Sequence, residues 1–159
     1  MKLAVRKGFG FGLTSGVIST LGLMVGLNSG THSADIVIGG ILVIAVADSM
    51  SDAVAIHMSE ESDAKETEST IWPETLVTFA SKFSIALLFV LPLLFLSLAT
   101  AIWLNIIFGL LIIAILSFYV AKLEKKNIAK MILSHVLIAI SVIIITKFLG
   151  QWAETLKHN

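Results

Sequence analysis

Two carboxylates lie in a stretch of the chain that is otherwise strongly apolar. Asp48 and Asp52 are four residues apart, so in a helix they project from one face, about 6 Å from each other. One aspartate at the centre of a membrane helix raises the free energy of membrane insertion by about 2.5–3.5 kcal/mol. Two such like charges also repel each other. We therefore expect the pair to face water, a cation, or a proton that neutralises one of them. The alternative is that the aspartates serve as caps or accept hydrogen bonds from neighbouring serines such as Ser49 and Ser51.

Several side chains that bind metals accompany this pair. Met50 lies between the aspartates; a methionine in an apolar helix usually only packs, but its thioether is also a ligand for softer metals. His57 follows two turns later, and neutral imidazole binds transition metals, although a histidine near a helix end is often only solvated. An acidic stretch comes next, which either collects cations at the mouth of a path or is simply solvated. Its carboxylates are Glu60, Glu61, Asp63, Glu66, Glu68 and Glu74.

The composition belongs to a membrane protein rather than a soluble domain. Hydrophobic residues make up 57% of the 159-residue chain and charged residues 14%, with a mean hydropathy of +0.96. A soluble domain carries about 25% charged residues. The formal net charge of zero argues against a nucleic-acid partner. The absence of cysteine excludes disulfides, thiolate metal sites and cysteine nucleophiles.

Charge-free runs predict five membrane-spanning helices. No Asp, Glu, Lys or Arg occurs in residues 8–34, 83–121 or 131–146, and one span needs about 20 mostly apolar residues. The helices are expected at about residues 8–27, 35–58, 76–96, 101–121 and 128–149. Residues 59–75 then form a short acidic segment outside the membrane. The predicted fold is an all-α membrane protein with a single transmembrane domain.

The distribution of basic residues predicts the orientation. With five spans, most lysines and arginines fall on one side, which the positive-inside rule makes cytoplasmic. These residues are Lys2, Arg6, Lys7, Lys65, Lys122, Lys125, Lys126 and Lys130, with Lys82 close to the same side. Only Lys147 and Lys157 fall on the other side. The N-terminus is therefore expected in the cytoplasm and the C-terminus outside it or in a lumen.

The first helix is rich in small residues. Gly8, Gly12 and Gly16 repeat every four residues, and Gly22 and Gly26 form a second pair. This spacing lets helix backbones approach closely, within one chain or across a dimer. Hydroxyl side chains on the same helix are expected to line a polar path. The residues assigned to that path are Thr14 and Ser15.

Two types of intramembrane protease do not fit the sequence. A serine protease would pair Ser15 with His135 in a Gly-x-Ser-Gly context, but the chain reads GLTSG. An aspartyl protease needs its aspartates on different helices, whereas Asp48 and Asp52 share one. We therefore expect no enzymatic activity.

The chain resembles the vacuolar iron transporter family, as a short, divergent member. The stretch GLTSGVISTLGLMVGLNSG (residues 12–30) is similar to the family's first-helix signature, G-x-N-D-G-L-V-S-T-L-A-L-V-x-G. Ser49-Met50 resembles the family's Ser-Met motif, and Pro92 matches its proline-bearing third helix. Five helices, a cytoplasmic segment after the second, and Gly150 after the fifth also agree.

The resemblance implies a homodimer that exports Fe²⁺, and often Mn²⁺, from the cytoplasm in exchange for protons. The path would run between the two first helices, lined by an aspartate, a methionine and a glutamate. Met50 matches the methionine, but the aspartate falls at Ser15 and the glutamate near Val54. The family's glutamate-rich cytoplasmic domain is reduced to the short stretch from Ser59 to Pro73.

Our leading hypothesis is a dimeric transporter of Fe²⁺ or Mn²⁺ with a relocated metal site. Asp48, Met50 and Asp52 would hold the metal, which is the substrate, and no permanent cofactor is expected. Metal would be collected in the cytoplasm by His57, Glu60, Glu61, Asp63, Glu66 and Glu68. The expected partners are a second copy of the chain, the lipid bilayer, metal ions and protons. The expected location is the cell membrane in a prokaryote or a vacuolar-type membrane in a eukaryote. The alternative is a non-transporting regulatory or structural partner that kept the fold and lost the site.

Overall fold

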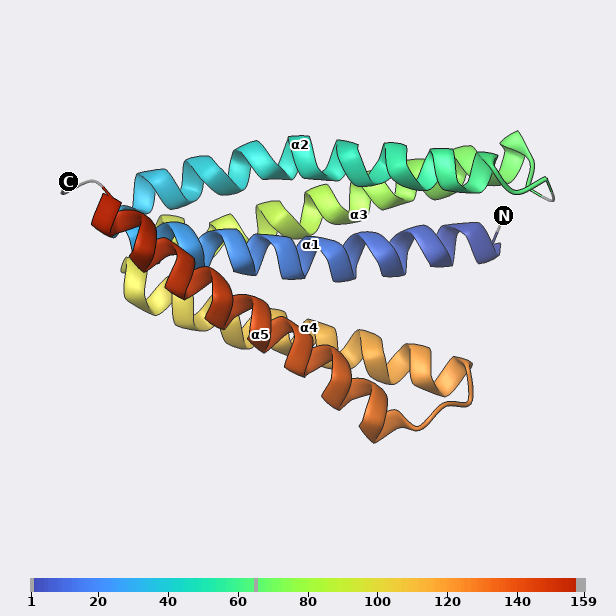
Figure 1. Cartoon of the computed structure of the whole chain (residues 1–159). Helices are drawn as coiled ribbons and strands as arrows, with labels where there is room; N and C mark the ends of the chain where they lie inside the picture. Colours follow the sequence, from blue (N-terminus) through green and yellow to red (C-terminus); the bar gives the residue numbers. More distant parts are fainter. Residues whose placement is uncertain (1, 65, 157–159) are drawn as a thin grey trace.

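Five long helices form the computed structural model, which describes residues 2–64 and 66–156 (Figure 1). They are α1 (Lys2–Thr31), α2 (Ala34–Glu61), α3 (Glu68–Phe95), α4 (Leu98–Leu123) and α5 (Ile128–Thr155). Each is long and apolar enough to cross a membrane. The prediction of five apolar spanning helices is confirmed, and the fold is that of a multi-pass membrane protein. Lys65 and Lys157, which entered the orientation argument, lie outside the described residues.

Side-chain caps fix where three of the helices begin. Ser33 Oγ accepts a hydrogen bond from the Ile36 amide at the start of α2, and Ser97 Oγ does the same for Thr100 at the start of α4. Asn127 Oδ1 accepts from the Lys130 amide at 2.9 Å before α5. Such caps satisfy backbone donors that a helix leaves unpaired in its first turn.

The largest difference from the predicted boundaries is at α3. It begins at Glu68, whereas the sequence predicted a start near Leu76. The Thr67 amide donates to Thr70 Oγ1 at 3.1 Å, which closes a capping interaction in an acidic, hydroxyl-rich stretch that had been expected to remain irregular. Pro73, the last residue of that acidic stretch, lies inside this helix. Residues 68–75 are therefore helical and not part of a loop.

This longer α3 changes the position of Lys82. The sequence placed Lys82 close to the cytoplasmic end of its span. In the structure it lies near the midpoint of α3, just as Asp48 lies near the midpoint of α2. The late predicted start of α3 had put Lys82 nearer to the helix end than it is; its depth in the membrane stays a prediction. The basic and acidic side chains consequently lie at a similar level in the bundle.

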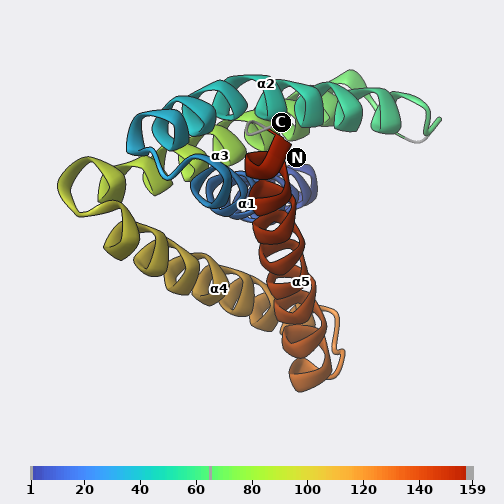
Figure 2. The same ribbon diagram turned by 60° about the vertical axis from the view of Figure 1, so that its left-hand side comes forward.

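The helix α1 lies at the centre of the arrangement. It packs against all four other helices, most extensively against α3 and α5, and α2 packs mainly on α3 (Figures 1 and 2). The α4–α5 hairpin diverges from the other helices toward the end of the bundle that holds the N-terminus. The two termini lie at opposite ends, as expected for an odd number of spans.

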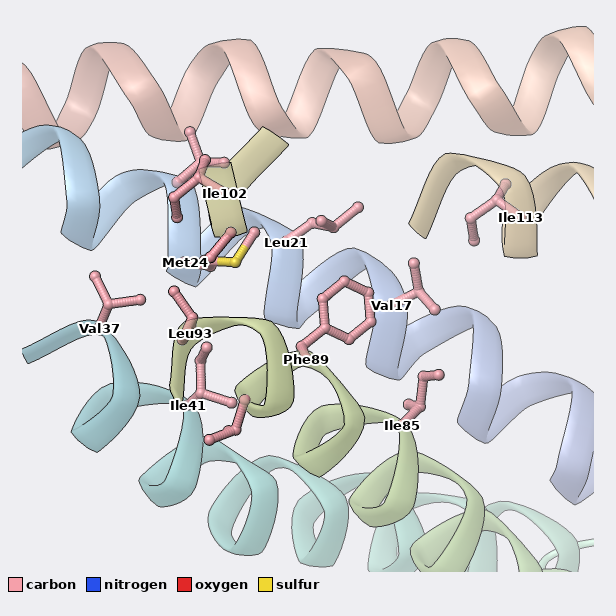
Figure 3. Packing of buried hydrophobic residues seen from close by; sticks show 13 residues of the cluster. Val17, Leu21, Met24, Val37, Ile41, Ile85, Phe89, Leu93, Ile102 and Ile113 are labelled. Carbon is pink, nitrogen blue, oxygen red and sulfur yellow. The ribbon is translucent and has the colours of Figure 1, made fainter. Parts of the chain in front are cut away.

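The apolar core is formed by α1 to α4. Val17, Leu21 and Met24 from α1 meet Phe89 and other apolar side chains of α2, α3 and α4 (Figure 3). In contrast, Ala139 is the one buried residue on α5 within the described chain. Large apolar side chains cover the outer surfaces of the helices. A surface of this kind is stable in lipid and would associate in water.

Both glycine rows of α1 are packing surfaces inside the chain. A Cβ atom added at Gly8 would lie 2.5 Å from the Glu74 carbonyl oxygen of α3, and one at Gly12 would lie 2.6 Å from that of Thr78. On the other side, a Cβ at Gly30 would lie 2.7 Å from the Gly150 carbonyl oxygen of α5. Glycine is thus required for α1 to approach α3 and α5 closely, as the spacing predicted.

Candidate functional site: an intramembrane ion cluster

Lys82 joins both intramembrane aspartates. Its Nζ atom lies 2.7 Å from Asp48 Oδ2 and 2.5 Å from Asp52 Oδ2. Ser15 Oγ donates a hydrogen bond to Asp52 Oδ2 at 2.6 Å and accepts one from Lys82 Nζ at 3.0 Å. We call these four residues, Ser15, Asp48, Asp52 and Lys82, the ion cluster. It connects the middles of α1, α2 and α3.

The helix packing explains how these residues meet. The one-turn spacing of Asp48 and Asp52 directs both carboxylates to the same side of α2. Close approach at Gly12 and Gly16 brings α1 against α3: a Cβ added at Gly16 would lie 3.3 Å from Lys82 Cα. Ser15, next to Gly16 in the chain, therefore comes within hydrogen-bonding distance of the ammonium.

The cation and the carboxylates differ in burial. Lys82 is 2% exposed, whereas the side chains of Asp48 and Asp52 are 33% and 21% exposed. With all three groups ionised, two carboxylates and one ammonium carry a formal charge of −1. The cluster thus has a cation enclosed by protein, and carboxylates that remain accessible from one side.

Asp48 and Ser15 of the cluster lie on the wall of a groove, whereas Asp52 and Lys82 do not. The groove has a volume of about 1120 Å³ and is formed by α1, α2 and α5. Most of its wall is apolar, including Leu23 and Leu149. Its polar wall residues are Thr14, Ser15, Ser19, Thr31, Asp48 and Thr146. Both residues that the sequence assigned to a polar path, Thr14 and Ser15, thus lie on the groove wall beside Asp48.

Met50 does not lie with the two aspartates. At 100° per residue it projects about 200° around α2 from Asp48, and it is 57% exposed on the outer surface. It is absent from the groove wall. The predicted set of three ligands is therefore not brought together within one chain, and the third member of the constellation is instead Lys82.

The residues expected to collect metal are spread over the end of the bundle near the N-terminus. His57 Nδ1 lies 3.0 Å from Thr75 Oγ1, and its ring packs edge-on against Trp72. Glu60 pairs with Lys7 at 3.4 Å. Glu66 accepts a hydrogen bond from Thr70 Oγ1 at 2.7 Å.

The remaining collecting residues, Glu61, Asp63 and Glu68, are exposed. Over residues 2–64 and 66–156, no three histidine, aspartate or glutamate side chains gather closely enough to hold a metal by themselves. Metal collection at this end therefore remains a prediction from the sequence.

A second polar contact within the membrane region joins α4 and α5. Ser117 Oγ lies 2.8 Å from His135 Nδ1, and Ser117 also donates to the Ile113 carbonyl oxygen at 2.6 Å. His135 therefore has a partner on α4, while Ser15 belongs to the ion cluster.

Lys82 is the site residue that the sequence analysis missed. Its signal was present: a lysine in an apolar helix, together with two aspartates in another, suggests opposite charges that pair within the membrane. The late start assigned to α3 concealed that signal.

Comparison of the chain with protein-family models, with curated proteins and with solved structures gives no match. The class of protein that fold and site define is a five-helix membrane protein with a central ion cluster.

Proposed function

We propose that the chain is a transporter that moves a divalent metal ion, Fe²⁺ or Mn²⁺, across the membrane in exchange for protons. The observation that carries the proposal is the convergence of Asp48 and Asp52 on Lys82 near the midpoints of two apolar helices, with Asp48 on the wall of a groove. Charged groups at this depth are costly, and they usually mark ion or proton paths.

The chemistry of the carboxylates supports a cation as the substrate. Asp48 and Asp52 supply hard oxygen donors, which suit Mn²⁺ and Fe²⁺, and both are partly exposed. The hydroxyls of Thr14 and Ser15 line the same groove and can replace part of the water around an ion. Met50 would contribute only from the outer face of α2, so we place the ion at the carboxylates.

We further propose that two copies associate along the groove. In a single chain, one face of α1 from Phe11 to Thr31 lines the groove between α2 and α5 and is not covered by another helix. A second α1 would close this opening and enclose Asp48 between the copies. The positive-inside rule supports a cytoplasmic N-terminus, because the α4–α5 connection with Lys125 and Lys126 lies at the same end (Figure 1). Metal would then leave the cytoplasm along the interface.

One observation favours the alternative, a partner protein that does not transport. Lys82 already forms ion pairs with both aspartates without any metal. An ion pair of this kind can serve only to hold α2 against α3. The two functions differ in what they require of the cluster: a transporter must release the pair in each cycle, and a structural partner must keep it.

Uptake of metal by proteoliposomes tests the proposed function. The purified full chain would be reconstituted, and influx of Fe²⁺ and of Mn²⁺ measured with and without an imposed pH gradient. We expect flux that rises with the gradient and is absent from empty vesicles. A folded protein that moves neither metal under either condition would support the non-transporting alternative.

A further inference from the structure

We propose that Lys82 is a tethered cation that occupies the two aspartates in the metal-free state and that the transported ion must displace. This inference rests on the proposed transport function and adds a role for one side chain. It names the competitor that the metal meets at its site.

The geometry gives the ammonium the position of a bridging ion. Nζ contacts the Oδ2 atom of each aspartate, at 2.7 Å for Asp48 and 2.5 Å for Asp52. Mn²⁺ or another divalent ion bound by the same two oxygens would lie about 2.0–2.6 Å from each. Two cations cannot occupy one such space, so binding of a metal requires that Lys82 withdraw.

Lys82 has the means to withdraw. Its ammonium ends a flexible four-carbon stem, and Ser15 Oγ lies 3.0 Å from Nζ as a second polar partner. The stem lies beside Gly16, where an added Cβ would come within 3.1 Å of Lys82 Cγ. The absence of a side chain at Gly16 thus leaves room for the stem next to α1.

A tethered cation also explains how the empty site stays stable in an apolar surrounding. After metal release, two bare carboxylates would remain in mid-membrane, at a cost of several kcal/mol. Lys82 compensates one of these charges and bridges both groups. It therefore acts as a specificity-determining residue, because only a cation that binds the carboxylates better than the ammonium can replace it.

Cross-linking of the wild-type chain tests this displacement. A membrane-permeant carbodiimide activates a carboxylate, the lysine amine attacks it, and an amide forms while the reagent leaves as the urea. A Lys82–Asp48 or Lys82–Asp52 link is detected by mass spectrometry as a cross-linked peptide that has lost one water. We expect the link in metal-free protein, because the reacting groups are in contact. Mn²⁺ at ten times its dissociation constant should lower the yield of this link about tenfold, in line with about 90% occupancy of the site.

The exposed pair Lys126 and Glu124 supplies an internal control in the same sample. Its cross-link should not respond to Mn²⁺. If no Lys82 link forms without metal, or if saturating Mn²⁺ leaves the yield unchanged while the protein transports Mn²⁺, the tethered cation is wrong and the transport proposal stands. If Mn²⁺ lowers the yield but no flux is found, Mn²⁺ binds and displaces Lys82 from the aspartates, and the transport proposal is wrong.

Discussion

The ammonium of Lys82 lies 2.5 Å from a carboxylate oxygen of Asp52, although the two residues belong to different helices and lie far from the helix ends. This contact ties α3 to α2 in the middle of an apolar bundle. Because Lys82 is almost fully buried, the pair is shielded from water on the lysine side. Its removal should therefore affect stability as well as ion binding.

Replacement of Lys82 by methionine should destabilise the fold. Lys82→Met keeps a similar length of side chain but leaves Asp48 and Asp52 without their cation. Breaking a buried ion pair from one side costs about 3–5 kcal/mol, and the partial exposure of the aspartates places the expected loss at the lower end. Unfolding in detergent micelles measures the change. Mn²⁺ should restore part of the loss, because it supplies the missing positive charge.

Lys147→Met is the matched control for that substitution. Lys147 is an exposed lysine on α5, so its replacement should change the free energy of unfolding by no more than about 0.5 kcal/mol. Equal effects of the two substitutions would mean that the Lys82 ion pairs do not stabilise the protein.

The Ser15 hydroxyl should contribute to the cluster through Asp52. Ser15→Ala removes the hydrogen bond that Ser15 donates to Asp52 Oδ2 at 2.6 Å. A hydrogen bond to a charged group is worth about 1.5–3 kcal/mol, and thermal unfolding should show a loss within this range. Ser19 lies one turn further along α1, and its buried hydroxyl finds no hydrogen-bond partner within the described residues. Ser19→Ala should therefore be close to neutral; a larger loss there than at Ser15 would contradict the assigned contacts.

The close approach of α1 and α3 can be tested with a single methyl group. Gly12→Ala would place Cβ 2.6 Å from the Thr78 carbonyl oxygen, which belongs to the α3 backbone and cannot rotate away. The helices must separate, at a cost of about 1–3 kcal/mol, and the contact between Ser15 and Lys82 should weaken with them. At Gly10 an added Cβ meets nothing within 4 Å. Gly10→Ala should match the wild type in both unfolding and carbodiimide cross-linking of Lys82.

Met50 provides a test of where the metal binds. Because it projects from the outer face of α2 and is 57% exposed, Met50→Leu should leave the dissociation constant for Mn²⁺ within about twofold of the wild type. The measurement is a metal titration followed by thermal unfolding. A tenfold weaker affinity would mean that Met50 is a metal ligand, as the sequence resemblance implied, and that the ion lies away from the ion cluster.

The helices could be predicted from the sequence because each contains a long apolar run. What the apolar runs do not reveal is where a helix ends outside the membrane. At α3, the polar stretch before Trp72 is helical because Thr67 and Thr70 form a local capping interaction. Such a contact depends on side-chain geometry that composition does not report, and the start of α3 was consequently placed too late.

The site was predicted in part. The four-residue spacing placed Asp48 and Asp52 on one face, and the structure keeps both at one site. The partner of the two aspartates depends on which helices pack together, and that depends on the glycine row of α1 and on contacts far apart in the chain. The sequence alone suggests that a lysine and two aspartates in apolar helices could pair, but only the packing shows that Lys82 contacts both Asp48 and Asp52. The position of Met50 was mispredicted for a related reason. Met50 lies between the two aspartates in the sequence, but its side chain projects from another face of α2.

Metal flux through vesicles that contain aspartate variants tests the central claim most directly. Proteoliposomes of the wild type, of the double variant Asp48→Asn/Asp52→Asn, and of Asp35→Asn as a control would be compared for uptake of Mn²⁺ under an imposed pH gradient. Asp35 lies exposed in the first turn of α2, away from the cluster. We predict gradient-dependent flux for the wild type and for Asp35→Asn, and loss of flux for the double variant although it remains folded. Equal flux in all three proteins would contradict the assignment of the ion cluster as the transport site.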